Sequence, residues 1–287
     1  PSEWVSGDDF DLEWANPEDF SGIGGVYYQI DTDPAVMRLP NPGYVVGDDI
    51  ESLQDIIVGE EGAHTVYLWL EDKAGNEDEF NRAALEEAFK RDNSPPVSDE
   101  PLIEGAKGCG KYYTESVTIT LRGHDDVSDV ANYSYIINGG ASIILPAAAP
   151  SFVVDGDGRH IIDYWATDVA GNREVEGNTT TIYIDATPPG SPGGLEVTPS
   201  GWSNANDFSV NWTKPWDYAG INAAHYKVGS PPTGPDDGQR VEKEGIFNLS
   251  GLSVTEEGET PLYVWLEDSA CNVDHTTATF VLLKYDA

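Results

Sequence analysis

The chain has 287 residues and carries 15 Lys and Arg against 51 Asp and Glu, a formal net charge of -36. Such a surface repels phosphate backbones and anionic lipid headgroups, which argues against nucleic acid and membrane surfaces as partners. No apolar run approaches the ~18 residues that a membrane-spanning helix needs, so we expect no membrane insertion by this segment. Three explanations of the acidity stay open: binding of divalent cations, hydration in a high-salt habitat, or solubility of a secreted protein.

Three copies of one sequence pattern follow one another along the chain. Residues 4–23 align without a gap with residues 202–221, and a more divergent copy occupies residues 112–130. Each copy continues with an aromatic strand and then with a tryptophan strand that ends in Asp-x-Ala-Gly-Asn or a close variant. The period of about 95 residues is too long for a helical solenoid unit and is typical of a small β-sandwich.

The first copy has predicted strands at 26–31 and 66–76. Residues 81–92 have a helix-favouring composition, but they align with the last strand of the third copy, so we expect a strand there. This copy has no counterpart of the lead-in strand predicted within 190–202. We therefore expect a chain cut from a longer array, or else a strand supplied by a neighbouring molecule as in donor-strand filaments. The first is preferred, since unpaired edges are usually tolerated or protected.

The later copies show the same order of elements. Residues 117–121 and 208–212 alternate between apolar and polar side chains, as strands with one face in a core do. The tryptophan strand follows at 162–172 and again at 262–272. A pair of prolines after Asp-Ala-Thr ends the second copy, because proline cannot extend a ladder.

These motifs resemble the immunoglobulin-like (Big-type) repeats of large bacterial and archaeal surface proteins. The resemblance rests on strand–Asp-x-Ala-Gly-Asn–strand–Asp-x-Thr-Pro-Pro and covers nearly the whole chain. It implies an all-β fold of three tandem immunoglobulin-like antiparallel β-sandwiches arranged end to end, at 1–96, 97–189 and 190–287. It also implies an extracellular or cell-surface location, with other repeats or neighbouring copies as partners. Function follows from it only weakly, because such repeats serve many purposes.

The topology that the resemblance implies brings acidic residues together at each junction. The Asp-x-Ala-Gly-Asn turn and the loop before the aromatic strand both lie at the end of a domain that faces the preceding linker. Three carboxylates there, with turn carbonyls and water, would supply the roughly six to eight oxygens that Ca2+ prefers and would turn mutual repulsion into a rigid joint. The expected ligands are Asp92, Asp125 or Asp126, and Asp168 at the first junction, and Asp185, Asp217 and Asp268 at the second.

A purely structural interpretation of the same aspartates stays open. Aspartate in such a turn can accept hydrogen bonds from the backbone of its own turn, and Gly75 or Gly171 can supply the positive φ angle. In the first repeat, Asp19 and Asp72 have no preceding linker in this sequence, so we expect any site there to be incomplete.

Catalysis is not predicted. The five histidines are dispersed, and no nucleophile, phosphate-binding or metalloprotease motif stands in a credible context. The alternative function is that of accessory or carbohydrate-binding modules of a secreted hydrolase, with a platform drawn from Trp4, Trp202, Trp212, Trp216, Tyr112 and Tyr113. Most tryptophans are expected in sandwich cores instead, with Trp69, Trp165 and Trp265 as aligned anchors. That leaves Trp216 as the candidate for exposure.

Two further residue classes carry expectations. The cysteines Cys109 and Cys271 belong to different repeats, and we expect them about a domain length apart, beyond the ~7 Å between Cα atoms that a disulfide can bridge. Each is then free or paired between molecules. Four Asn-x-Ser/Thr sequons are candidates for glycosylation in an archaeal or eukaryotic exterior: Asn132, Asn178, Asn211 and Asn248.

The sequence therefore predicts a non-catalytic spacer from an extracellular or cell-surface protein, such as a stalk, adhesin, surface layer or filament. Divalent cations are expected to stiffen its joints.

Overall fold

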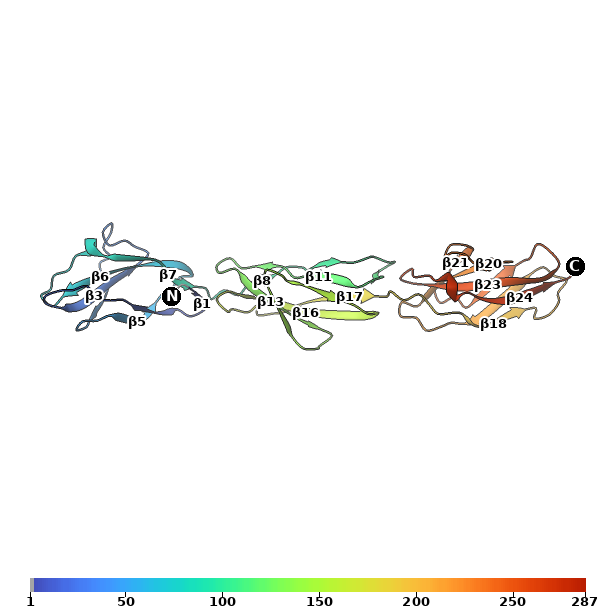
Figure 1. The fold of residues 1–287 in the computed structure, drawn as a ribbon, viewed down its shortest axis with the longest axis horizontal. Coiled ribbons are helices and arrows are strands. Elements are labelled where there is room, and N and C mark those ends of the chain that lie inside the picture. The colour runs from blue at the N-terminus through green and yellow to red at the C-terminus, as the bar shows by residue number, and fades with distance from the viewer. Residues whose placement is uncertain (1–2) are drawn as a thin grey trace.

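The computed structural model describes residues 3–287, which form three β-sandwich domains arranged end to end (Figure 1). Apart from two short 3-10 segments, the described chain consists of strands and the loops between them. Within residues 3–287, no helix combines the length and apolar character that a bilayer crossing requires. The prediction of tandem immunoglobulin-like antiparallel sandwiches is confirmed, except that the short edge strands at Trp4–Val5 and Tyr112–Tyr113 pair in parallel.

The first domain packs a five-stranded sheet, in the order β1-β7-β6-β3-β4, against the two-stranded sheet β2-β5. Residues 83–91 of the predicted segment 81–92 form a strand, β7, because their backbone pairs with β6 and this pairing outweighs a helix-favouring composition. The elements are β1 (Trp4–Val5), β2 (Asp9–Glu13), β3 (Ile23–Ile30), β4 (Gly43–Val46), β5 (Ser52–Ile57), β6 (Gly62–Asp72), η1 (Glu79–Asn81) and β7 (Ala83–Arg91).

The second domain combines the sheet β10-β17-β16-β13-β14 with the three-stranded sheet β15-β11-β9 and the short pair β12-β8. Its elements are β8 (Val97–Ser98), β9 (Leu102–Glu104), β10 (Tyr112–Tyr113), β11 (Val117–Thr120), β12 (Gly123–His124), β13 (Val130–Ile137), β14 (Ile143–Pro146), β15 (Ser151–Val154), β16 (Gly158–Asp168) and β17 (Asn178–Ile184).

The third domain combines the sheet β21-β20-β23-β24 with the sheet β18-β19-β22. Its first strand, β18, is the predicted lead-in strand and pairs with β19. In the first domain the counterpart of β19 is β2, which pairs only with β5 among the described residues. The elements are β18 (Gly193–Thr198), β19 (Phe208–Thr213), β20 (Ile221–Val228), β21 (Gln239–Glu242), β22 (Asn248–Leu252), β23 (Gly258–Asp268), η2 (His275–Thr277) and β24 (Thr279–Tyr285).

Each domain has its own hydrophobic core between its sheets, and the tryptophan strand contributes to that core by alternation. In β23 the side chains of Leu262, Val264 and Leu266 face the core, so Trp265 lies on the opposite face of the sheet. Trp69 and Trp265 are thus buried as expected, but the three aligned tryptophans lie outside the cores between the sheets, so the expectation that they anchor those cores is wrong.

These tryptophans are covered by loops and charged side chains on the outer face. Trp69 is 1% exposed and donates from Nε1 to Glu77 Oε2 at 3.0 Å. Trp265 is fully buried and donates to the carbonyl oxygen of Pro235 at 3.1 Å. Trp165 is only half-buried, beneath the guanidinium of Arg173 at 4.1 Å from the ring centre. Arg38, in the loop after β3, places its guanidinium 5.6 Å from the Trp69 ring centre, and Pro235 lies in the loop after β20, so these two loops cover the tryptophans on the outer face in the first and third domains.

Candidate metal centres at the domain joints

Two clusters of three aspartates lie where consecutive domains meet. At the first joint, Asp92 follows β7, Asp125 lies in the loop before β13, and Asp168 ends β16. One carboxylate oxygen of each residue lies within 4.8 Å of the corresponding atoms of the other two. Asp126, the other residue considered for this place, is exposed and lies outside the cluster. Asp125 takes the position, accepting hydrogen bonds on Oδ1 from the backbone of Val127 and Ser128.

The second joint repeats this arrangement with Asp185 after β17, Asp217 before β20 and Asp268 at the end of β23, again within 4.8 Å. In both clusters the linker aspartate and the strand-end aspartate are buried and the loop aspartate is half-buried. The six clustered aspartates take part in no ion pair within residues 3–287. The carboxylates therefore face one another without a protein cation to offset their repulsion.

The Asp-x-Ala-Gly-Asn turn holds the strand-end carboxylate in place. Asp168 Oδ1 accepts from the backbone of Asn172 at 2.7 Å, and Asp168 Oδ2 accepts from Asn172 Nδ2 at 2.8 Å. Asp268 makes the same two contacts with Asn272, each at 2.8 Å. The hydrogen bonds of the purely structural interpretation therefore exist, and they engage both carboxylate oxygens of the strand-end aspartate in each cluster.

The asparagine of this turn also contacts the preceding domain, a role that the sequence interpretation did not assign. Asn172 Nδ2 donates to the carbonyl oxygen of Asp92 at 2.8 Å, and Asn272 Nδ2 donates to that of Asp185 at 2.8 Å. The recurrence of asparagine at the end of all three copies of the motif is the sequence signal that pointed to it.

The first joint contains polar atoms that are buried and lack partners. Asp92 is fully buried, and its Oδ2 has no hydrogen-bond partner among the described residues. Ser128, 4% exposed, has an Oγ that likewise lacks a partner within that range. A buried carboxylate oxygen without a partner is costly, so this oxygen has capacity left for a proton, a water molecule or a cation.

Burial disfavours the charged form of four of the six carboxylates. Burial raises the pKa of Asp92, the Ser128 hydroxyl and the Ser94 amide oppose the rise, and the charges of Asp125 and Asp168 add to it. Burial also raises the pKa of Asp185. At the second joint, burial and then the neighbouring carboxylates raise the pKa of Asp217 to about 6. Burial, opposed by hydrogen bonds from Asn272, raises the pKa of Asp268 to about 6. A bound cation would reverse this effect, since it favours the charged form of each ligand.

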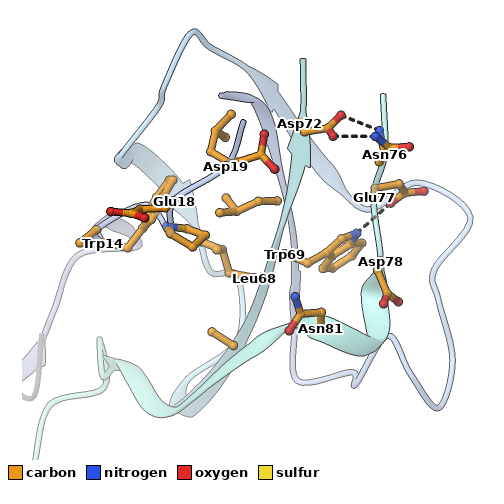
Figure 2. Close-up of a pocket in the computed structure, with 15 residues that line it drawn as sticks. Trp14, Glu18, Asp19, Leu68, Trp69, Asp72, Asn76, Glu77, Asp78 and Asn81 are labelled. Atoms are coloured by element: carbon orange, nitrogen blue, oxygen red, sulfur yellow. Dashed lines mark hydrogen bonds between the residues drawn. The ribbon is translucent and has the colours of Figure 1, made fainter. Parts of the chain in front are cut away.

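The corresponding end of the first domain carries only part of this arrangement (Figure 2). Asp72 Oδ2 accepts from Asn76 Nδ2 at 2.6 Å, as in the other two turns, and Asp19 lies nearby on an exposed loop. Both line a cavity of about 610 Å³ that Trp14 and Trp69 also border. No third carboxylate joins Asp19 and Asp72 in a cluster within residues 3–287.

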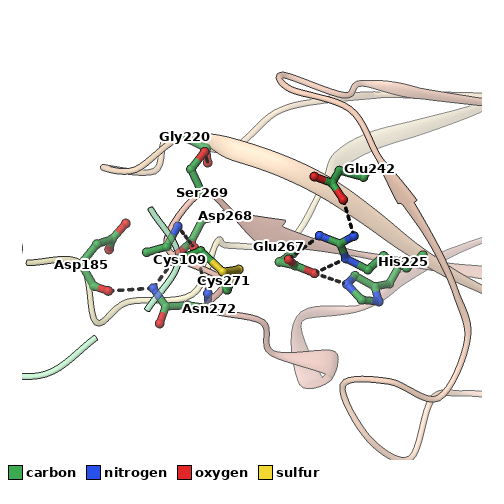
Figure 3. Close-up of a disulfide and its surroundings, with 12 residues drawn as sticks. Cys109, Asp185, Gly220, His225, Glu242, Glu267, Asp268, Ser269, Cys271 and Asn272 are labelled. Atoms are coloured by element: carbon green, nitrogen blue, oxygen red, sulfur yellow. Dashed lines mark hydrogen bonds and ion pairs between the residues drawn. A yellow bond between two sulfur atoms is a disulfide. The ribbon is translucent and has the colours of Figure 1, made fainter. Parts of the chain in front are cut away.

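The two cysteines form a disulfide across the second joint (Figure 3). The Cα atoms of Cys109 and Cys271 are 5.4 Å apart, so the expectation of a domain-length separation is wrong. The error has a topological cause. Cys109 lies between β9 and β10, at the end of the second domain from which β17 leads into the linker, and Cys271 lies in the turn that faces the same linker.

A charged network around the buried carboxylate of Glu267 lies next to the second joint (Figure 3). Glu267 accepts from Arg240 on both carboxylate oxygens at 2.8 Å, and its Oε2 lies 2.7 Å from His225 Nε2. Arg240 and His225 together lower the pKa of Glu267. Both oxygens of the glutamate are used within the protein, and His225 stacks on Trp265, so these groups brace the outer face of the domain.

The aromatic residues considered for a sugar-binding platform do not gather on one surface. Trp212 and Tyr113 are buried in the cores of different domains. Trp216 is 85% exposed, as expected, and lies in the loop before β20, whereas Trp202 is 58% exposed beside Tyr285 at the opposite end of the third domain. The remaining two, Trp4 and Tyr112, are half-buried in edge strands.

The sequons all fall within strands and not in loops. Three of the asparagines are half-buried and Asn211 is exposed; the four are Asn132 in β13, Asn178 in β17, Asn211 in β19 and Asn248 in β22. Asn178 Nδ2 donates to Glu174 Oε1 at 2.9 Å.

Comparison with known proteins gives no family assignment. The chain matches no protein-family model and no curated protein. Among solved structures it is similar to a segment of two fibronectin type-III domains from chicken tenascin, with 14% identity and a TM-score of 0.29, covering 67% of this chain and 99% of that one. It is also similar to the FN1–FN3 domains of chicken CNTN1, with 12% identity and a TM-score of 0.35, covering 98% of this chain and 95% of that one.

Proposed function

We propose that this chain is a non-catalytic structural segment of an extracellular or cell-surface protein, a spacer whose joints are stiffened by Ca2+. The observation that carries the proposal is the recurrence, at both joints of an end-to-end array, of three carboxylates within 4.8 Å of one another. Three carboxylates with backbone carbonyls and water match the oxygen coordination that Ca2+ takes. The same ligand type disfavours softer metals, which select sulfur or imidazole.

The unpartnered oxygen of Asp92 supports a ligand at the first joint beyond the acidic cluster itself. Turn chemistry accounts for the hydrogen bonds of Asp168 and Asp268, but it leaves Asp92 Oδ2 buried without a partner. Each proposed site draws one carboxylate from the linker and two from the following domain, so an ion bound there would fix the angle between domains. The Asp-x-Ala-Gly-Asn turns would then serve both the fold and the joint.

An oxidising exterior fits the disulfide between the second and third domains, since such bonds persist mainly outside the cytosol. We retain the sequons as candidate glycosylation sites and other repeats or neighbouring copies as partners. The alternative, a carbohydrate-binding accessory module, gains no support from the scattered aromatic residues. Binding of the chain to an insoluble polysaccharide in a pull-down would support this alternative.

Calcium titration tests the proposal. After chelator treatment and at constant ionic strength, the oxidised chain is expected to bind two Ca2+ ions, each with a Kd of about 10⁻³ M or tighter, the range of extracellular modules. The double variant Asp125→Asn with Asp217→Asn is expected to lose both ions. The matched control is Asp126→Asn with Asp236→Asn, which removes the same charge from exposed positions outside the clusters. Equal binding by the two double variants would contradict the assignment.

A further inference from the structure

The two joints are built from the same aspartate pattern but differ in how they are held. The second joint carries the only two cysteines of the chain, joined as Cys109–Cys271 at a sequence separation of 162. The position equivalent to Cys271 is Gly171 in the second domain and Gly75 in the first, so the first joint has no covalent counterpart. The second joint is therefore held by a covalent bond, whereas the first joint is held by non-covalent contacts alone.

Backbone packing reinforces the second joint around the disulfide. The amide of Cys109 donates to the carbonyl oxygen of Ala270 at 2.9 Å, and Ala270 is fully buried. Gly108 lies so close that a Cβ there would stand 2.4 Å from the same oxygen. The two domains therefore meet here in direct main-chain contact.

Side chains add two further contacts across this joint. Tyr112 meets Tyr218 edge to face, with ring centres 6.3 Å apart and planes at 86°. Ala219 donates from its backbone to Asp185 Oδ2 at 2.9 Å, so the linker aspartate of this joint has a partner from the following domain. None of these contacts involves a cation.

The first joint relies on fewer interactions of this kind. Asn172 Nδ2 donates to the carbonyl oxygens of Asp92 and Ser94, at 2.8 Å and 3.4 Å. The oxygen of Asp92 that corresponds to the one satisfied by Ala219 at the second joint has no partner that meets hydrogen-bond geometry among the described residues, although the Ser128 hydroxyl of the following domain lies near enough to act on the Asp92 carboxylate. Loss of a bridging cation would leave the three carboxylates of this joint to repel one another with little else to oppose them.

We infer that the Cys109–Cys271 disulfide makes the two cation sites unequal: the second joint is locked whether or not Ca2+ is bound, and the first is a Ca2+-dependent hinge. This inference rests on the proposed function for the hinge, while the lock stands on the disulfide and its contacts. The covalent bond holds Asp185 against Asp217 and Asp268 before the ion arrives, so the second site is preorganised. We expect it to bind Ca2+ about tenfold or more tightly than the first site, and to lose that advantage on reduction.

Distances within each domain pair test the inference directly. Fluorophores attached through azide-bearing residues leave the cysteines untouched, and exposed positions exist in all three domains at Val36, Val175 and Phe247. The pair at 36 and 175 reports on the first joint, and the pair at 175 and 247 reports on the second. The distance distribution between the two fluorophores is measured by single-molecule Förster resonance energy transfer in four conditions: Ca2+ or chelator, each with or without an excess dithiol. Reduction converts both Sγ atoms to thiols while one dithiol closes to its cyclic disulfide.

Chelator alone is expected to broaden the distance distribution of the first pair and to leave the second unchanged; chelator with dithiol is expected to broaden both. The variant Cys109→Ser with Cys271→Ser should behave like the reduced chain without any reductant. Broadening of the second pair in chelator alone, or a narrow second pair after reduction and chelation, would overturn the lock. If Ca2+ does not bind, the first pair will be the same in Ca2+ and chelator, while the second still responds to reduction.

Discussion

Replacing Asp92 with asparagine is expected to stabilise the calcium-free protein and to destabilise the calcium-bound one. Without the ion, the substitution removes a buried carboxylate whose pKa is raised by burial. The Nδ2 atom of the new asparagine can then donate hydrogen bonds toward Asp125 and Asp168. We expect the free energy of unfolding to rise by about 1–2 kcal/mol in chelator. With the ion, loss of one of three carboxylates is expected to weaken Ca2+ binding at this joint by about a hundredfold or more, about 2.8 kcal/mol.

The measurement is the melting temperature of the full chain in chelator and in saturating Ca2+. Saturating ligand raises stability in proportion to the logarithm of its excess over Kd, so the variant should gain less from calcium than the unaltered chain. Asp126→Asn is the matched control, because Asp126 is the adjacent exposed aspartate outside the cluster. If Asp92→Asn lowers the melting temperature both in chelator and in Ca2+, the carboxylate stabilises the fold by itself and does not act as a cation ligand.

Replacing Trp265 with alanine is expected to lower the stability of the third domain by about 3–5 kcal/mol, the usual cost of removing a fully buried tryptophan. Its ring is fully buried, stacks on His225 and donates a hydrogen bond to the loop carbonyl of Pro235. Gly238 packs against it so closely that a Cβ would stand 2.6 Å from the ring. The substitution would leave a cavity beneath this loop and an unpaired carbonyl oxygen.

Calorimetry of the whole chain measures this effect as a shift of one transition. For a domain of this size, we expect the third-domain transition to fall by more than about 10 °C. The control is Trp216→Ala in the same domain, where an 85% exposed ring should contribute within about 0.5 kcal/mol. Similar shifts for the two variants would refute the conclusion that Trp265 holds the loop against the outer face of the sheet.

The acidic clusters could be located from sequence because they depend on chain direction alone. In a sandwich of alternating strands, the turn after the tryptophan strand must face the preceding linker, and this places Asp168 beside Asp92 and Asp268 beside Asp185. The choice between Asp125 and Asp126 could not be made in this way. The second copy has Asp129, with a φ of 69°, where the others have Gly22 or Gly220, and its loop presents the earlier aspartate.

The disulfide and the tryptophans could not be placed from sequence, for related reasons. The pairing of Cys109 with Cys271 depends on where the loop between β9 and β10 lies. That loop has no regular alternation of apolar and polar residues from which its path could be predicted. The recurrence of Trp69, Trp165 and Trp265 showed a shared structural role but not which face of the sheet they occupy. The core face is identified by Val264 and Leu266, the residues on either side of Trp265, whose side chains point to the opposite face of the strand. The loop that buries Trp265 comes from another part of the chain.

Solution scattering of the oxidised chain in Ca2+ and in chelator, at a constant ionic strength of about 0.15 M, tests the central claim most directly. In Ca2+ the pair-distance distribution should match the straight three-domain array of Figure 1. In chelator it should broaden toward shorter distances, because the carboxylates of Asp92, Asp125 and Asp168 repel one another and the first joint bends. Superimposable curves in the two solutions would contradict a calcium-stiffened spacer.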